Sequence, residues 1–147
     1  MNIAGWINEK QKSGLITVEE RTDCYRSNQV ICDFADALFP HLPKTKSRNN
    51  QTTGHDGVFK IKNHEVQDYF KKHKPIVLRY DRKTDTMNLP AINIGMTKGR
   101  TYERVLIFPT KKMKDYLQTN NLSQAGDLAK LYVAVTRAKH SVCFVID

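Results

Sequence analysis

The sequence is poor in the residues that mark disulfide-rich, zinc-binding, fibrous and disordered chains. It has only three cysteines and no Cys-x-x-Cys pair, so it indicates neither a disulfide framework nor a structural zinc site. Seven glycines and five prolines in 147 residues exclude collagen-like and low-complexity chains. No apolar run reaches the length of a signal-peptide core or a membrane span. We therefore expect a folded domain in the reducing cytoplasm, without a membrane partner.

The charge that is present is mostly positive and unevenly distributed. The formal net charge is +9, and residues 41–83 carry 11 basic and 4 acidic side chains. Lysine and arginine at this density can neutralise phosphates and release counterions, the usual source of sequence-independent affinity for nucleic acid. A solvated basic surface without a ligand explains the same counts equally well. Charge alone leaves both interpretations open.

Short apolar runs alternate with amphipathic stretches, a pattern typical of a layered α/β domain. Continuous runs such as Val105–Phe108 and Val142–Ile146 indicate strands that are buried on both faces of a parallel sheet. The predicted strands are Leu15–Val18, Val58–Ile61, Ile76–Leu78, Ala91–Ile94, Arg104–Phe108 and Ser141–Ile146. The polar stretch Pro43–Gly57 is predicted to be a loop.

Four helices are predicted from apolar spacing and from residues that favour helix ends. Pro40 and Pro75 are expected to stop the first two helices. In the fourth helix, which continues through Arg137, apolar residues recur at the i, i+3, i+4, i+7 spacing of one buried face. The predicted N-caps are Ser27, Asn63, Thr110 and Ser123.

Arg26 is the first candidate site residue, because it precedes a predicted helix N-terminus. Free backbone amides and the helix dipole make such a position favourable for phosphate. The alternative is an ordinary surface arginine beside a capping serine. We also expect this residue, like the candidates that follow, to lie beside a strand end, where α/β sheets bind ligands.

The second candidate is the loop Gly95–Glu103, which lies between two apolar strands. Gly95 and Gly99 bracket Lys98, and the hydroxyl of Thr101 follows, so amides and side-chain donors can converge on phosphate oxygens. The loop is not a Walker A motif, because GxxxxGK[ST] occurs nowhere in the chain. No element is therefore expected to cradle the β-phosphate of ATP and to hold its magnesium ion.

Arg137 is the third candidate. At about 100° per residue it projects away from the apolar face of the fourth helix, on a side shared with the small residues Val133 and Ala134. An arginine on such a face indicates a covered cleft. An arginine that extends into solvent from the end of a helix is the alternative.

The order of these segments resembles the second RecA-like domain of superfamily-one helicases of the UvrD/Rep type. Tyr25-Arg-Ser27 is similar to motif IV of that family, Lys98-Gly99 and the following strand to motif V, and Tyr132-Val-Ala-Val-Thr-Arg-Ala-Lys139 to motif VI. The resemblance spans residues 24–146. It implies an α/β fold of the RecA-like, three-layer type, with a mostly parallel sheet flanked by helices.

The resemblance also implies roles for individual residues. Arg26 and Arg137 would be catalytic, reaching the γ-phosphate of ATP across a cleft between two domains. Gly99 and Thr101 would lie near the nucleotide, and Asn93, Gly95 and Lys98 would lie near single-stranded DNA. ATP with Mg²⁺ would be bound in the full-length protein and not by this chain alone, and no metal site is expected within it.

Two departures from the family pattern affect these roles. Thr101 stands where a ribose-contacting glutamate is usual, and Gly95 stands where a histidine is frequent. The first RecA-like domain of the family has no counterpart in the sequence, so we expect residues 1–147 to be one domain of a larger protein. The leading hypothesis is the C-terminal domain of an ATP-dependent helicase, whose partners are its N-terminal RecA-like domain and single-stranded DNA. The alternative is a nucleic-acid-binding module that keeps the fold without ATP chemistry.

Overall fold

A parallel five-stranded sheet forms the centre of the chain. The computed structural model describes residues 21–97 and 99–146, so the predicted strand Leu15–Val18 lies outside the described residues. Neighbouring strands in the sheet follow the order β3-β7-β6-β4-β5, and every pair is parallel. The strands are β3 (Gly57–Ile61), β4 (Ile76–Arg79), β5 (Ile92–Asn93), β6 (Tyr102–Phe108) and β7 (Ala138–Val145).

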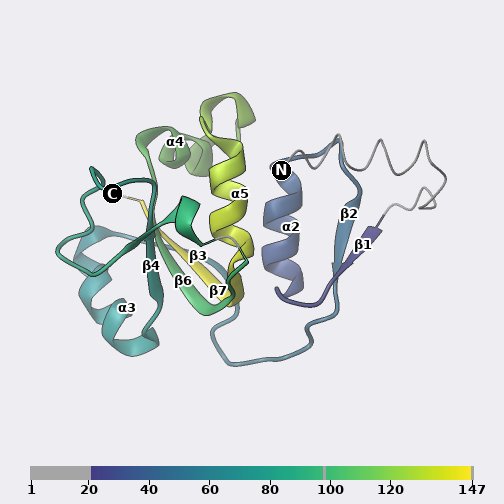
Figure 1. The fold of residues 1–147 in the computed structure, drawn as a ribbon, viewed down its shortest axis with the longest axis horizontal. Helices are drawn as coiled ribbons and strands as arrows, with labels where there is room; N and C mark the ends of the chain where they lie inside the picture. Colours follow the sequence, from purple (N-terminus) through teal and green to yellow (C-terminus); the bar gives the residue numbers. More distant parts are fainter. Residues whose placement is uncertain (1–20, 98, 147) are drawn as a thin grey trace.

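Helices cover both faces of this sheet, which gives three layers (Figure 1). One face packs against α2 (Gln29–Ala37), α4 (Lys111–Thr119) and α5 (Leu128–Thr136). The other face packs against α3 (Val66–His73), which follows a 3₁₀ turn over Asn63–Glu65.

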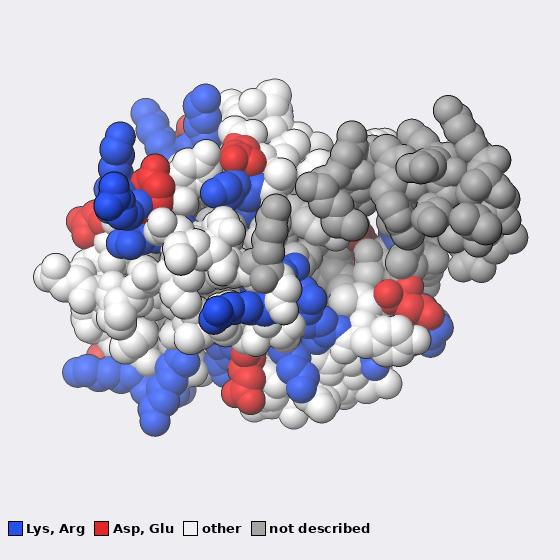
Figure 2. All heavy atoms as spheres, in the orientation of Figure 1, with Lys and Arg blue, Asp and Glu red and all other residues white. Residues whose placement is uncertain are grey.

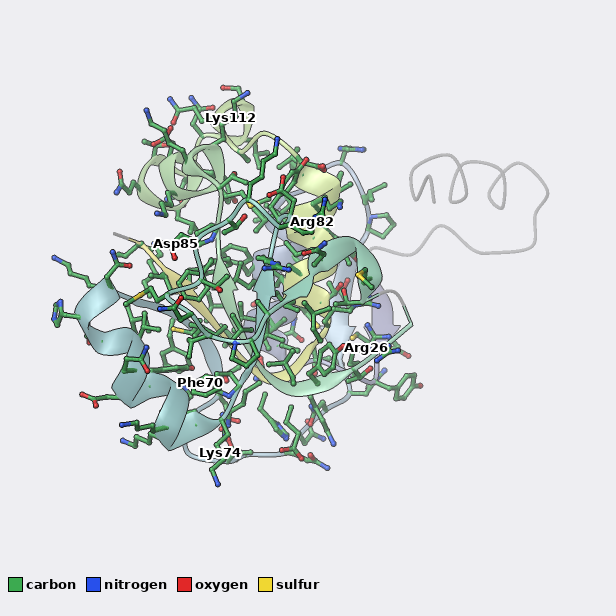
Figure 3. The ribbon with its side chains drawn as sticks, turned by 60° about the vertical axis from the view of Figure 1, so that its left-hand side comes forward. Arg26, Phe70, Lys74, Arg82, Asp85 and Lys112 are labelled. Atoms are coloured by element: carbon green, nitrogen blue, oxygen red, sulfur yellow. The ribbon has the colours of Figure 1, made fainter. Side chains whose placement is uncertain are left out.

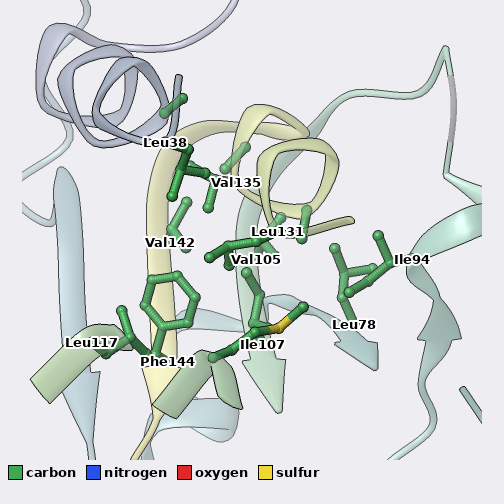
Figure 4. Packing of buried hydrophobic residues seen from close by; sticks show 14 of the residues in the cluster. Leu38, Leu78, Ile94, Val105, Ile107, Leu117, Leu131, Val135, Val142 and Phe144 are labelled. Atoms are coloured by element: carbon green, nitrogen blue, oxygen red, sulfur yellow. The ribbon is translucent and has the colours of Figure 1, made fainter. Parts of the chain in front are cut away.

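Side chains of β6 alternate between the two faces of the sheet and contribute to the hydrophobic core on each face. Val105 and Ile107 point to the side of α5, and Leu106 and Phe108 point to the side of α3, as the two-residue period of a strand requires. All four are at most 5% exposed, which confirms the prediction of a strand buried on both faces. Figure 4 shows the larger core, in which Val142 and Phe144 of β7 lie beside Leu131 and Val135 of α5 or Leu117 of α4.

The predicted strands and helices within the described residues are present, with shifted ends. β7 begins three residues before the predicted Ser141, because Ala138 pairs with Tyr102 at the start of β6. β5 has only two residues and continues into a 3₁₀ turn over Ile94–Met96. α2 and α3 end before Pro40 and Pro75 as predicted, and α3 closes at Lys74 with a left-handed φ of 49°.

Three of the four predicted helix caps are wrong. Asn28, not Ser27, caps α2 through its side chain, which accepts from Ile31 N. Ser27 is instead buried, and its hydroxyl donates to the carbonyl oxygen of Ala138. Asp127, not Ser123, caps α5. The turn before α3 starts at Asn63 itself, with Lys62 as its N-cap, whereas Thr110 caps α4 as predicted.

The prediction of a loop over Pro43–Gly57 is wrong in its first part. Lys44–Ser47 forms β2, which pairs in parallel with β1 (Arg21–Cys24) in a second, two-stranded sheet. The carboxylate of Asp36 on α2 anchors β2, because it accepts from both the backbone N and the hydroxyl of Thr45. The sequence missed β2 because its four residues are polar and none is buried. No helix among the described residues is long and apolar enough to cross a membrane.

Candidate functional site

Arg137 lies at the junction between α5 and β7. It is the C-cap of α5, so the prediction that it lies inside the helix is wrong by one residue. Its side chain is half-buried, and its two terminal nitrogens donate long hydrogen bonds of 3.4 Å, one to Thr97 O and one to Thr136 Oγ1. Its Nε is buried and has no hydrogen-bond partner among the described residues. The guanidinium therefore keeps donor capacity for a further acceptor.

Arg26 lies beside Arg137 because it binds the end of the same helix. Its Nη1 donates a 2.8 Å hydrogen bond to the carbonyl oxygen of Thr136, the last residue of α5. The two residues after Arg26 attach this turn to the start of β7: Ser27 Oγ donates to Ala138 O at 2.6 Å, and Asn28 Nδ2 donates to His140 O at 2.7 Å. Segments more than 100 residues apart thus deliver two arginines to one place.

No carboxylate in the described part of the chain neutralises this pair. Within residues 21–97 and 99–146 neither Arg26 nor Arg137 forms an ion pair with an acidic residue. Burial, followed by the charge of Arg26, lowers the pKa of Arg137. Two cations held together at a half-buried site without a counter-charge favour binding of an anion, and a planar guanidinium with free donors suits phosphate oxygens.

The arginine pair lies at the amino ends of the strands. The backbone N of Tyr102, the first residue of β6, donates to Arg137 O at 2.8 Å just before β7 begins. The pair thus lies beside strand ends, as expected, but at the amino ends, whereas open α/β sheets usually bind ligands at the carboxyl ends of their strands. The carboxyl edge holds instead a cavity of about 220 Å³ lined partly by Phe108, Pro109 and Val145.

The candidate nucleotide residues Gly99 and Thr101 lie on the connection between Thr97, which contacts Arg137, and the start of β6. Gly99 has a left-handed φ of 77°, a conformation that favours glycine. Thr101 is exposed. Chain connectivity therefore keeps both residues near the arginine pair. Lys98, predicted to contact DNA, lies outside the described residues.

The other candidate DNA residues, Asn93 and Gly95, lie at the opposite end of this segment. The side-chain oxygen of Asn93 accepts a 2.8 Å hydrogen bond from Arg79 Nε, so part of its amide is already used. Gly95 is exposed, and a Cβ atom added to it would lie 2.9 Å from Lys130 Nζ of α5. The ammonium of Lys130 thus occupies the space that a side chain at position 95 would fill.

Sequence reasoning missed three residues around the site. Lys130 gave no signal, because it is 35 positions from Gly95 in the sequence and meets it only in the fold. Tyr25 belongs to the Tyr25-Arg-Ser27 segment, but the sequence did not show that its side chain is 77% exposed beside Arg26. The hydroxyl of Tyr102 is buried and lacks a hydrogen-bond partner in the described part of the chain.

The basic residues of the segment 41–83 do not form one surface. Lys44 and Lys46 lie on β2 beside α2, whereas Lys71, Lys72 and Lys74 belong to α3 and its end, on the other face of the sheet. Figure 3 shows Arg26 and Lys74 well apart. On the face drawn in Figure 2, Lys and Arg side chains stand in separate groups with acidic residues among them. No group of three or more potential metal ligands occurs among the described residues.

Similar structures are domains of helicases. The helicase nsp10 of PRRSV matches 85% of this chain with a TM-score of 0.51 and 22% identity, and this chain covers 23% of it. An arterivirus nonstructural protein 10 helicase, solved in complex with DNA, matches 84% with a TM-score of 0.53 and 20% identity, and this chain covers 25% of it. The domain is RecA-like. The predicted fold class is thereby confirmed.

The C-terminal domain of a possible DNA helicase from Lactobacillus plantarum matches 82% of this chain at 17% identity with a TM-score of 0.47, and this chain covers 86% of that domain. No protein-family model and no curated protein matches the sequence. The chain spans about a quarter of the length of the viral helicases that it matches.

Proposed function

We propose that this chain is the second RecA-like domain of an ATP-dependent helicase or translocase, and that Arg26 and Arg137 act on the γ-phosphate of ATP held mainly by a partner domain. The observation that carries the proposal is the arginine pair itself. Among the described residues, two cations converge without a carboxylate partner, and one of them has a buried Nε donor that makes no hydrogen bond. In phosphoryl transfer such cations stabilise the charge that develops on the transferred group.

The surroundings of the pair suit a nucleotide. The exposed ring of Tyr25 offers a face on which a base can stack, next to the cation that would meet the phosphates. Gly99 and Thr101 would line the same side of the domain, facing the nucleotide. Because the pair lies at the amino edge of the sheet and no Walker A loop accompanies it, the β-phosphate and Mg²⁺ would be held by the partner RecA-like domain. The arrangement is therefore half of a site that becomes complete between two domains.

Single-stranded DNA is the proposed second ligand. One of the similar helicases was solved with DNA, which supports this class of partner. We assign the contact to the segment from Asn93 to Lys98, with Lys130 as an added phosphate contact over Gly95. The same segment runs from Gly95 beside Lys130 to Thr97 beside Arg137, so it links the proposed strand contact to the proposed nucleotide contact. The assignment to the UvrD/Rep branch rests on the order of the sequence motifs.

The test is ATP hydrolysis measured for the isolated chain, for the parent protein with its first RecA-like domain, and for the two halves mixed. The proposal expects no turnover from the isolated chain, with or without single-stranded DNA, and DNA-stimulated turnover when the first domain is present. Parent protein that binds single-stranded DNA without hydrolysing ATP would instead identify the chain as a nucleic-acid-binding module.

A further inference from the structure

The 3₁₀ turn over Ile94–Met96 holds a large apolar side chain in solvent. Met96 is 70% exposed, and Tyr25 and Val30 are the only other exposed large hydrophobic residues within 21–97 and 99–146. Both ends of the turn are fixed, because Ile94 and Thr97 are buried. The backbone N and the hydroxyl of Thr97 donate to Ile94 O at 3.1 and 2.7 Å. The exposure of Met96 therefore belongs to an anchored turn.

A cation is held directly beside this turn. The ammonium of Lys130 lies over the ring of Tyr80, with Nζ 5.3 Å from the ring centroid, and such a ring face attracts a cation. The ring is itself held in place, because the Tyr80 hydroxyl donates a 3.3 Å hydrogen bond to Asp127, the N-cap of α5. Tyr80 is therefore a positioning residue for Lys130. Within the described residues, Lys130 forms no ion pair that would neutralise it.

Gly95 joins the cation to the exposed apolar residue. It directly precedes Met96, its backbone is exposed, and a Cβ atom on it would lie 2.9 Å from Lys130 Nζ. The missing side chain thus lets the ammonium, and any ligand bound to it, approach the turn closely. A nucleotide of a single strand has the matching two parts, a phosphate and a base with an open, polarisable face. In a duplex the same faces are covered by stacking on neighbouring base pairs.

Building on the strand contact proposed above, we propose that Met96 packs against an unpaired base of the DNA strand whose phosphate meets Lys130, and that Met96 makes this site select single-stranded over double-stranded DNA. The attraction of Lys130 for phosphate cannot make this distinction, because both forms carry phosphates. An unbranched thioether adapts to the face of any base, so the contact is independent of base sequence. Met96 is thus assigned to specificity for the unpaired strand, and Lys130 to attraction.

The test compares two single-stranded oligonucleotides of equal length and equal charge, a thymidine strand and a fully abasic strand. Their affinity for the 147-residue chain is measured by fluorescence anisotropy at low salt. The wild-type chain should bind the thymidine strand about two- to tenfold more tightly, the size of a contact between a thioether and an aromatic face. Met96→Ala should bring this ratio close to one, whereas Met96→Leu, which keeps an apolar side chain, should retain most of it.

Two further variants separate the base contact from general effects. Lys130→Ala should weaken binding of both strands alike and leave their ratio unchanged, because it removes a phosphate contact only. Val30→Ala, at another exposed apolar position on α2, should leave both the affinities and the ratio unchanged. With a duplex of the same length as a third ligand, Met96→Ala should lower the preference for the single strand by the factor that it removes from the base ratio. A melting curve for each variant confirms that it is folded.

The outcomes distinguish this inference from the strand contact on which it rests. Equal binding of the thymidine and abasic strands by the wild-type chain would overturn the role of Met96 and leave the phosphate contact of Lys130 standing. A base preference that survives in folded Met96→Ala would equally overturn it, because another residue would then carry the contact. A chain that binds neither strand at low salt would overturn the inference together with the proposed strand contact.

Discussion

The guanidinium of Arg26 donates a 2.8 Å hydrogen bond to the carbonyl oxygen of Thr136, the residue directly before Arg137. This bond does two things at once. It satisfies a carbonyl at the C-terminal end of α5, where a cation is also favoured by the helix dipole. It also sets Arg26 beside Arg137, so the position of each arginine depends on the end of the same helix.

Ser27 is expected to position Arg26. Its buried hydroxyl donates to Ala138 O at 2.6 Å, and its own carbonyl oxygen accepts from Ser47 Oγ at 2.6 Å. Ser27→Ala should lower the free energy of unfolding by about 1–3 kcal/mol, because a buried acceptor loses its partner. Ser27→Ala should also reduce ATP turnover of the parent protein under conditions in which the variant is fully folded. Urea denaturation beside a turnover assay separates the two effects, and an unchanged unfolding midpoint would contradict the role of the bond.

Lys130 is expected to contribute one phosphate contact to DNA binding. Lys130→Ala should weaken binding of single-stranded DNA and reduce the steepness of the salt dependence by about 0.7, the share of one neutralised phosphate on a single strand. Lys111→Ala is the matched control, because Lys111 is an exposed lysine on α4. Fluorescence anisotropy at several salt concentrations measures both quantities. Equal slopes for Lys130→Ala and wild type would remove Lys130 from the DNA path.

Stability should fall in mild acid because of two stacked histidines. His55 lies between the rings of Phe59 and His73, with centroid distances of 4.0 and 3.9 Å. Burial, and then the neighbouring charges of His73 and Arg104, lower the pKa of His55 to about 4, and burial with Arg104 also lowers that of His73. The unfolded chain therefore takes up more protons, so stability is complete above about pH 7 and is lost as pH falls from about 6.5 toward 4.

The measurement for this pH dependence is the melting temperature between pH 5 and pH 7.5. The wild-type chain should melt at a lower temperature at pH 5, and His73→Gln should flatten the dependence. His64→Gln, at an exposed position in the 3₁₀ turn before α3, should leave it unchanged. An identical slope in all three proteins would show that the stacked pair is not its source.

The sequence predicted the main sheet and its helices well, because burial on both faces leaves a continuous apolar run and a half-buried helix leaves a 3.6-residue period. It failed where short polar segments pack by hydrogen bonds. β2 has four polar residues and owes its place to Asp36, which lies in another element. The caps failed for a similar reason, since Ser27 and Asn28 are both good cap residues and only the contact of Ser27 with β7 decides between them.

Site residues could be predicted where they lie within a sequence motif that can be recognised. Arg26 and Arg137 could be named from the sequence, and the resemblance implied that both reach one phosphate. Their lack of a counter-charge among the described residues and their place at the amino ends of the strands follow from the fold alone. Lys130 could not be found, because its relation to Gly95 is a contact between side-chain and backbone atoms of distant segments.

The most direct test of the account is steady-state ATP hydrolysis by the parent protein carrying Arg137→Ala, read beside a melting curve. Turnover should fall by about two or more orders of magnitude, since arginines of this kind contribute on the order of a thousandfold, and Arg137→Lys should restore little because an ammonium lacks the planar fork. Stability should change little, because within residues 21–97 and 99–146 the side chain makes only two hydrogen bonds, both long. Arg82→Ala, at an exposed arginine after β4, should match wild type. Turnover per folded molecule that survives in Arg137→Ala would contradict the assignment of Arg137 to the γ-phosphate.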